Sequence, residues 1–291
     1  MKAQLAFKTD ALLGEGAIWN HKDNTLFWVD IEGKKLHIYD PAKQTDRFLA
    51  TESRVGTVVP YSNSEAVVAL ENGIYFIDLE TGKTRLLSDV ESDQPGNRFN
   101  DGKCDPNGNL WVGSMHYEQS RPEASLYRIN KNGQTAKMKD NITISNGIVW
   151  TNDKSIMYYI DTPTGVIKAF DYNPDTSEIS NERIAVEINP EDGFPDGMAI
   201  DENDHLWVGL WNGNAVAQYD PVSGDLIRKV MVPAHNVTAC AFGGAKLDTL
   251  YITTSSLDMT KEEQQKYPDA GSIFKVVPGV KGVKSPFFGL K

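Results

Sequence analysis

An oxygen-bearing side chain precedes a glycine at the start of four similar strand-like runs in this 291-residue chain. The four pairs are Glu15-Gly16, Asp101-Gly102, Asn146-Gly147 and Asp196-Gly197. The glycines are 86, 45 and 50 residues apart, so the first interval has room for one further copy. That copy begins at Val55, and a last copy begins at Thr238 and continues to the run 271–277. Six units of roughly 45 residues, each made of short strands, are typical of a β-propeller.

The unit that begins at Ser145 shows how one blade is encoded. Its apolar, β-branched or alternating runs fall at 145–151, 156–162, 166–172 and 182–188. Turns rich in Asn, Asp, Pro and Gly separate these runs, as expected between strands. Four strands make one blade. We therefore expect an all-β, six-bladed propeller with four-stranded blades, formed by residues 1–291 as a single domain.

A propeller must also close its ring, because an open last blade would leave a strand edge exposed. The run 3–9 precedes the first unit and has the pattern of a lone strand. We expect it to join the blade that contains 271–277. The segment 259–271 is expected to contribute no more than a short helical turn within a loop.

Composition limits the partners and the compartment of this protein. The net charge of −11 argues against nucleic acid, which binds to basic patches. No apolar run reaches the length of about 20 residues needed to span a membrane. Lys8 and Asp10 interrupt any apolar signal segment, and the two cysteines, Cys104 and Cys240, are too few for a disulfide framework. We expect a cytoplasmic protein, a monomer or weak oligomer, with a small-molecule partner.

The residue before each repeat glycine should face the propeller axis, because the first strand of a blade lines the central channel. Glu15, Asn146 and Asp196 would then supply two carboxylates and one amide carbonyl at one mouth of that channel. Such hard oxygen donors suit Ca²⁺, Mg²⁺ or Mn²⁺, and Zn²⁺ when waters fill the open positions. Two carboxylates packed together without a cation would repel each other. The alternative interpretation is that these pairs are ordinary turn dipeptides.

A second group of polar residues precedes the glycine at 102. Arg98 and Asn100 lie just before it, and the arginine fork suits the hydroxyl or carboxylate oxygens of a substrate. The polar segment 116–124 follows the next strand and is expected to form a loop over the channel mouth. His116 and Glu118 could reach a ligand from this loop. The alternatives are a surface ion pair for Arg98 and solvated loop positions for His116 and Glu118.

The order and spacing of the motifs resemble one known family. The stretches GEGAIW, NRFNDGKCDPNGNLWVGSM, ISNGIVW, PDGMAID and LWVGLWNG are similar to those of the gluconolactonases, senescence marker protein 30 and the luciferin-regenerating enzymes. The resemblance implies a six-bladed propeller with one divalent metal held by Glu15, Asn146 and Asp196. It implies substrate contacts from Arg98, Asn100 and Glu118. The loop that carries Glu118 has Tyr117 where many relatives have a second acid.

The implied reaction is hydrolysis of a sugar lactone to its aldonic acid. The metal would polarise the carbonyl, and Asp196 would act as the general base. Two other functions stay open. One is a phosphotriesterase-like or other promiscuous esterase activity on the same metal propeller. The other is a non-catalytic propeller that binds a partner across its face.

Overall fold

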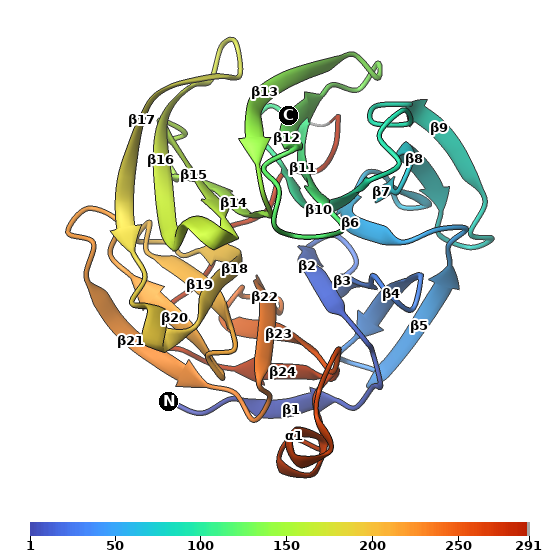
Figure 1. Ribbon diagram of the computed structural model, residues 1–291. Helices are drawn as coiled ribbons and strands as arrows, with labels where there is room; N and C mark the ends of the chain where they lie inside the picture. The colour runs from blue at the N-terminus through green and yellow to red at the C-terminus, as the bar shows by residue number, and fades with distance from the viewer. Residues whose placement is uncertain (290–291) are drawn as a thin grey trace.

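The computed structural model describes residues 1–289. Six four-stranded antiparallel sheets are arranged as blades around a central axis, as Figure 1 shows. The expected six-bladed β-propeller is confirmed. Helical structure within residues 1–289 is limited to α1 (Lys261–Lys266) and two short 3-10 turns, η1 (Thr162–Thr164) and η2 (Pro190–Asp192).

Five blades are built from strands that follow one another along the chain, and each blade runs from an inner to an outer strand. The first contains β2 (Gly14–Asn20), β3 (Thr25–Asp30), β4 (Lys35–Asp40) and β5 (Thr45–Ala50). The second contains β6 (Val55–Pro60), β7 (Glu65–Leu70), β8 (Gly73–Asp78) and β9 (Thr84–Ser88). The third contains β10 (Asn97–Cys104), β11 (Leu110–His116), β12 (Ala124–Ile129) and β13 (Thr135–Ile142). The fourth contains β14 (Ser145–Trp150), β15 (Ile156–Asp161), β16 (Val166–Asn173) and β17 (Glu178–Glu187), and the fifth contains β18 (Phe194–Ile200), β19 (Leu206–Trp211), β20 (Ala215–Tyr219) and β21 (Leu226–Met231).

The sixth blade joins the two ends of the chain. Its inner strands are β22 (Asn236–Gly243), β23 (Thr249–Ser255) and β24 (Ile273–Val276), and its outermost strand is β1 (Gln4–Phe7). β1 pairs antiparallel with β24, with Leu5 opposite Phe274. The predicted closure of the ring by the N-terminal strand is therefore confirmed. Figure 1 shows β1 along the outer edge of this blade.

The first strand of every blade is interrupted at the position of the repeat motif. In all six blades the pairing between the first and second strands shifts register there. Such bulges bend a strand and turn side chains in new directions. Gly16 has a φ of 61°, which glycine adopts without strain. At Gly147 an added Cβ would lie 2.9 Å from the Asp196 carbonyl oxygen, so neighbouring inner strands require glycine for their close approach.

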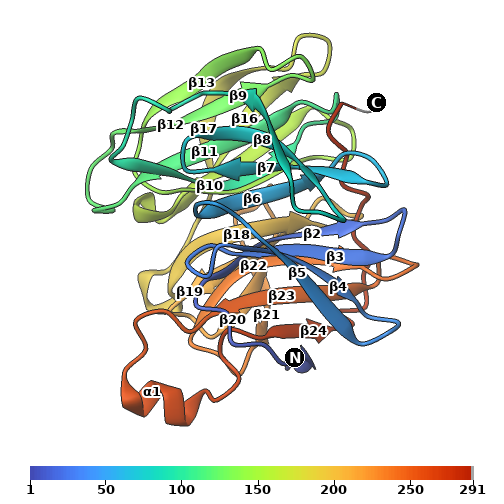
Figure 2. The same cartoon turned by 90° about the vertical axis from the view of Figure 1, so that its right-hand side faces the viewer.

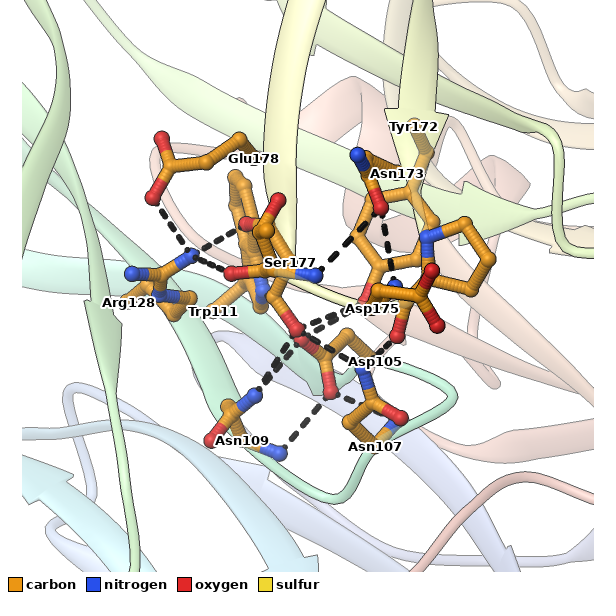
Figure 3. A network of polar contacts seen from close by, with 12 residues as sticks. Asp105, Asn107, Asn109, Trp111, Arg128, Tyr172, Asn173, Asp175, Ser177 and Glu178 are labelled. Carbon is orange, nitrogen blue, oxygen red and sulfur yellow. Dashed lines mark hydrogen bonds and ion pairs between the residues drawn. The ribbon is translucent and has the colours of Figure 1, made fainter.

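The recurrent tryptophans are structural. Trp28, Trp111 and Trp207 are fully buried, and their indole N–H groups donate to Asp46, Asp105 and Asp201. Figure 3 shows the network around Asp105, which also accepts from Tyr172 in the neighbouring blade. The three Trp–Asp hydrogen bonds lie within single blades, whereas the rings of Trp111 and Trp207 pack against Tyr172 and Phe242 of the next blade, as expected for packing rather than ligand stacking.

The two mouths of the channel differ. Figure 2 shows α1 at the side where the inner strands begin and the C-terminal segment at the side where they end. Thr260 and Glu263 form a reciprocal capping box at the start of α1.

Within residues 1–289 no helix is long and apolar enough to cross a bilayer. Cys104 and Cys240 are buried free thiols.

Candidate active site

A cavity of about 620 Å³ opens at the mouth where the inner strands begin. Five of the six metal- and substrate-binding residues that the family resemblance implies line it, and each side chain is nearly fully buried. They are Glu15 on β2, Arg98 and Asn100 on β10, Asn146 on β14 and Asp196 on β18. Four separate blades thus bring their polar side chains to one place, because each residue lies at the start or the bulge of an inner strand.

A directed chain of hydrogen bonds runs around the wall of this cavity. The Arg98 guanidinium donates to the Asn100 side-chain oxygen at 2.7 Å. The Asn100 amide donates to the Asn146 oxygen at 3.0 Å. The Asn146 amide in turn donates to the Thr162 hydroxyl at 2.8 Å, and that hydroxyl donates to the Pro195 carbonyl at 2.8 Å.

The end of this chain fixes which way Asn146 faces. The Pro195 carbonyl can only accept, so the single hydroxyl proton of Thr162 must point to it. The Thr162 oxygen is then left to accept, which requires the NH₂ side of Asn146 to face it. The carbonyl oxygen of Asn146 therefore faces Asn100. This oxygen has a second lone pair available for a cation.

Two carboxyl groups share the same cavity. Burial raises the pKa of Glu15, and the nearby charge of Asp101 adds to this effect. Burial likewise raises the pKa of Asp196 well above its usual range, and the charges of Glu15 and Asp101 raise it further. Backbone N–H groups and Arg98 oppose these shifts. Burial and mutual repulsion thus make the ionised pair unfavourable in the protein alone.

The donor set fits a hard divalent cation. One Asp196 oxygen is buried without a hydrogen-bond partner, although buried polar atoms are rarely left unpaired. A cation would pair this oxygen and offset the repulsion between Glu15 and Asp196. The set contains two carboxylates and the Asn146 carbonyl. Within residues 1–289 no group of three or more His, Cys, Asp and Glu side chains is placed to hold a metal, so the amide is essential to this interpretation.

Asp101 behaves differently from the other repeat acids. It is buried but does not line the cavity, and its carboxylate accepts from the Gly102 amide at 2.8 Å. On β10 the register shift falls between Phe99 and Gly102, so the bulge contains Asn100 and Asp101. Asn100 therefore turns to the cavity in place of Asp101. The position of both residues in the repeat predicts that they lie near the axis. The geometry of the bulge determines which of the two side chains faces the cavity.

Glu118 and His116 do not line the cavity. The Glu118 side chain is 58% exposed and forms an ion pair with Arg121 at 3.0 Å. His116 ends β11, and its ring lies 3.9 Å from Glu123. The loop after β11 instead brings Tyr117 to the cavity. The Tyr117 hydroxyl donates to Glu71, and Arg54 bridges Glu71 to the cavity residue Glu32.

Several further residues of the cavity were not expected from the sequence. They include Glu32, Thr162, Trp211, His235 and Asn236. The side-chain oxygen of Asn236 is buried without a partner. Asn236 begins the inner strand β22, so counting back from the last repeat would have found it. Thr162 follows the second strand of the fourth blade, and Trp211 ends the second strand of the fifth blade. The repeat motif does not extend to these positions.

Comparisons with known proteins agree with this geometry. Residues 13–256 match the family described as the SMP-30/Gluconolactonase/LRE-like region. The chain belongs to this family. The resemblance drawn from the sequence motifs is therefore confirmed.

Individual relatives of this SMP-30/gluconolactonase family cover nearly the whole chain. The chain is 40% identical over 274 residues to a Bacillus subtilis protein named "Putative sugar lactone lactonase YvrE", covering 94% of each. It superposes with a TM-score of 0.94 and 27% identity on regucalcin of Agrobacterium tumefaciens, described as a calcium-binding protein, covering 98% of this chain and 97% of that one. It superposes with a TM-score of 0.91 and 31% identity on a luciferin-regenerating enzyme, covering 99% and 100%. Membership in the family supports a hydrolase acting on sugar lactones in general.

Proposed function

We propose that this protein is a divalent-metal-dependent lactonase that hydrolyses an aldonolactone to its aldonic acid. The observation that carries the proposal is the unpartnered, buried oxygen of Asp196 in a cavity that it shares with Glu15 and Asn146. A binding scaffold gains nothing from burying two carboxylates together. In a hydrolase, the same two carboxylates would provide a cation site and a general base next to each other.

Glu15, Asn146 and Asp196 hold the cation in this proposal. When bound, a divalent cation supplies Lewis acidity to the lactone carbonyl and lowers the pKa of an adjacent water. Ca²⁺ fits the oxygen donors, and Mg²⁺, Mn²⁺ and Zn²⁺ are the other candidates. The calcium binding named for the Agrobacterium relative supports Ca²⁺ as the first ion to test.

Asp196 acts as the general base. The unpartnered oxygen of Asp196 would hold the cation, and the other oxygen of the same carboxylate accepts a proton from the water that attacks the carbonyl carbon. The tetrahedral intermediate then collapses, the bond from the carbonyl carbon to the ring oxygen breaks, and the ring oxygen takes the proton. The product is the open-chain aldonic acid. Proton transfer by a placed carboxylate contributes roughly 10²–10⁴-fold to the rate of such reactions.

Arg98 and Asn100 bind and orient the sugar. Both are buried at the cavity wall. One guanidinium nitrogen of Arg98 donates to Asn100 and to the Phe99 carbonyl, which leaves the other N–H groups for substrate oxygens. The cavity of about 620 Å³ has room for a small sugar lactone. Glu118 joins this set only if its loop closes over the cavity.

The test is hydrolysis of a substrate panel by chelator-stripped protein with Ca²⁺, Mg²⁺, Mn²⁺ and Zn²⁺ added back singly. The panel contains gluconolactone, xylonolactone, arabinolactone, an aryl ester and an organophosphate triester. The proposal predicts metal-dependent turnover of at least one aldonolactone at a higher kcat/KM than of the ester or the triester. Preference for the triester or the ester would replace it with the esterase alternative. Absence of both turnover and metal binding would favour the scaffold.

A further inference from the structure

A second cavity, of about 630 Å³, lies at the opposite mouth of the propeller. Its wall includes residues at the ends of inner strands, among them Cys104 on β10, Trp150 on β14 and Ile200 on β18. The first cavity is lined by residues near the starts of these same strands. The C-terminal segment 283–287 forms another part of the wall. Figure 2 shows this segment on the side away from α1.

The titratable side chains that line this second cavity, apart from the thiol of Cys104, are all basic types. They are His21, Lys22, Lys103, Lys154 and Lys284, and no Asp or Glu is among the lining residues. This is unexpected in a chain with a net charge of −11. None of the four lysines forms an ion pair with a described carboxylate. Lys103 instead donates to the Met198 carbonyl.

The charges of two of these lysines act on His21. Burial lowers the pKa of His21, and the charges of Lys284 and Lys22 lower it further. The carboxylates nearest in sequence do not line the cavity: Asp23 accepts from Asn20 and Asp153 accepts from Ser155, while Asp101 lies close enough to Lys103 for their charges to interact. The residues that line the cavity therefore carry positive charge with no carboxylate among them.

The same cavity has an aromatic wall. Phe287 is buried, its ring centroid lies 4.6 Å from that of His21, and the Lys22 ammonium lies 4.7 Å above it. Trp150 is also buried, and its indole N–H has no hydrogen-bond acceptor among the described residues. An acceptor group that reached this wall would satisfy that donor. Positive charge beside flat apolar surface suits a ligand that combines an anion with a ring.

We propose that this lysine-lined cavity is a binding site for a small organic anion, a phosphate- or carboxylate-bearing compound with a planar ring. The lysines supply the charge complement, and Phe287 and Trp150 supply the apolar surface. The site lies at the mouth opposite the candidate active site, so the same chain holds a cation site at one end of its channel and an anion site at the other. The proposal does not depend on the lactonase activity.

The test is calorimetric titration of the full-length protein with phenyl phosphate, benzoate, inorganic phosphate and the neutral analogue phenol at low ionic strength. We expect phenyl phosphate to bind more tightly than inorganic phosphate, phenol to show no binding, and added salt to weaken the anions. The double variant Lys154→Gln/Lys284→Gln should weaken phenyl phosphate binding roughly fivefold or more. Both lysines are exposed, so the substitutions leave the core untouched.

The matched control is Lys83→Gln/Lys246→Gln, which removes the same charge from two exposed lysines outside the cavity. We expect this control to keep the wild-type affinity, and gluconolactone not to displace phenyl phosphate. The proposal is overturned if no anion binds. It is equally overturned if the two double variants weaken binding by the same factor, because the anion would then respond to net charge rather than to this site.

Discussion

The Thr162 hydroxyl holds Asn146 in one orientation, because it accepts from the Asn146 amide and donates its own proton to the Pro195 carbonyl, both at 2.8 Å. Pro195 immediately precedes Asp196. One hydroxyl thus ties a proposed ligand on β14 to the backbone beside another proposed ligand on β18. The relationship links the geometry of two blades at the centre of the candidate active site.

Thr162→Val should weaken metal binding by roughly 10–100-fold, the usual effect of losing a group that orients a metal ligand. Valine keeps the shape of threonine but cannot accept from Asn146, so the amide is free to rotate. Calcium titration by calorimetry measures the effect. Thr162→Ser keeps the hydroxyl and should retain affinity within about threefold of the wild type. Equal affinities for Thr162→Val and the wild type would show that Thr162 does not orient the ligand.

The metal-free protein should lose stability as pH rises. Burial raises the pKa of Glu15, Asp101 and Asp196 in the folded state, and for Glu15 the value rises from 4.5 to about 8. Between those two values the folded protein binds more protons than the unfolded chain, so the free energy of unfolding falls with increasing pH. We predict a Tm that declines between about pH 5 and about pH 8 in chelator, and a weaker or reversed decline with saturating Ca²⁺.

Glu15→Gln is the matched control for this pH dependence, because glutamine keeps the shape but does not titrate. Its Tm in chelator should decline less steeply than that of the wild type. A metal-free wild-type protein whose Tm climbs over the same range would contradict the account of the buried carboxylates.

Asp105→Ala should destabilise the protein by roughly 3 kcal/mol or more, because several buried donors lose their acceptor together. Asp105 is fully buried and accepts from Trp111, Tyr172 and the Asn109 side chain at 2.9–3.0 Å, as seen in Figure 3. Chemical denaturation measures the loss. Asp175→Ala removes an exposed carboxylate in the same region and should change stability by no more than about 0.5 kcal/mol. A similar loss from both variants would argue against the network as the cause.

Asn100 and Glu118 should differ in their effect on catalysis. Asn100→Ala breaks the hydrogen-bond chain between Arg98 and Asn146 and should lower kcat/KM at least about tenfold. Glu118→Gln alters an exposed side chain paired with Arg121 and should change kcat/KM by less than about threefold. Steady-state kinetics on one lactone compare the two. A larger loss for Glu118→Gln would show that its loop closes over the substrate.

The blade architecture could be predicted from the sequence because strand runs, turn residues and the repeat glycine recur with one period. The same periodicity brought Glu15, Asn146 and Asp196 to one cavity, since equivalent positions of a propeller converge on its axis. The periodicity could not show which of Asn100 and Asp101 faces the cavity, because the length of the β10 bulge depends on pairing with β11. Thr162 and Glu32 lie in turns that follow second strands and carry no repeated signal, so only the folded chain shows that they face the site.

The most direct test of the central claim compares Asp196→Asn with Asp196→Ala. Asparagine keeps an oxygen donor but cannot accept the proton from water. We predict that lactone turnover falls by at least about 10²-fold in both variants, while calcium affinity is retained better in Asp196→Asn than in Asp196→Ala. Near-wild-type turnover of metal-loaded Asp196→Asn would contradict the role of Asp196 as the base.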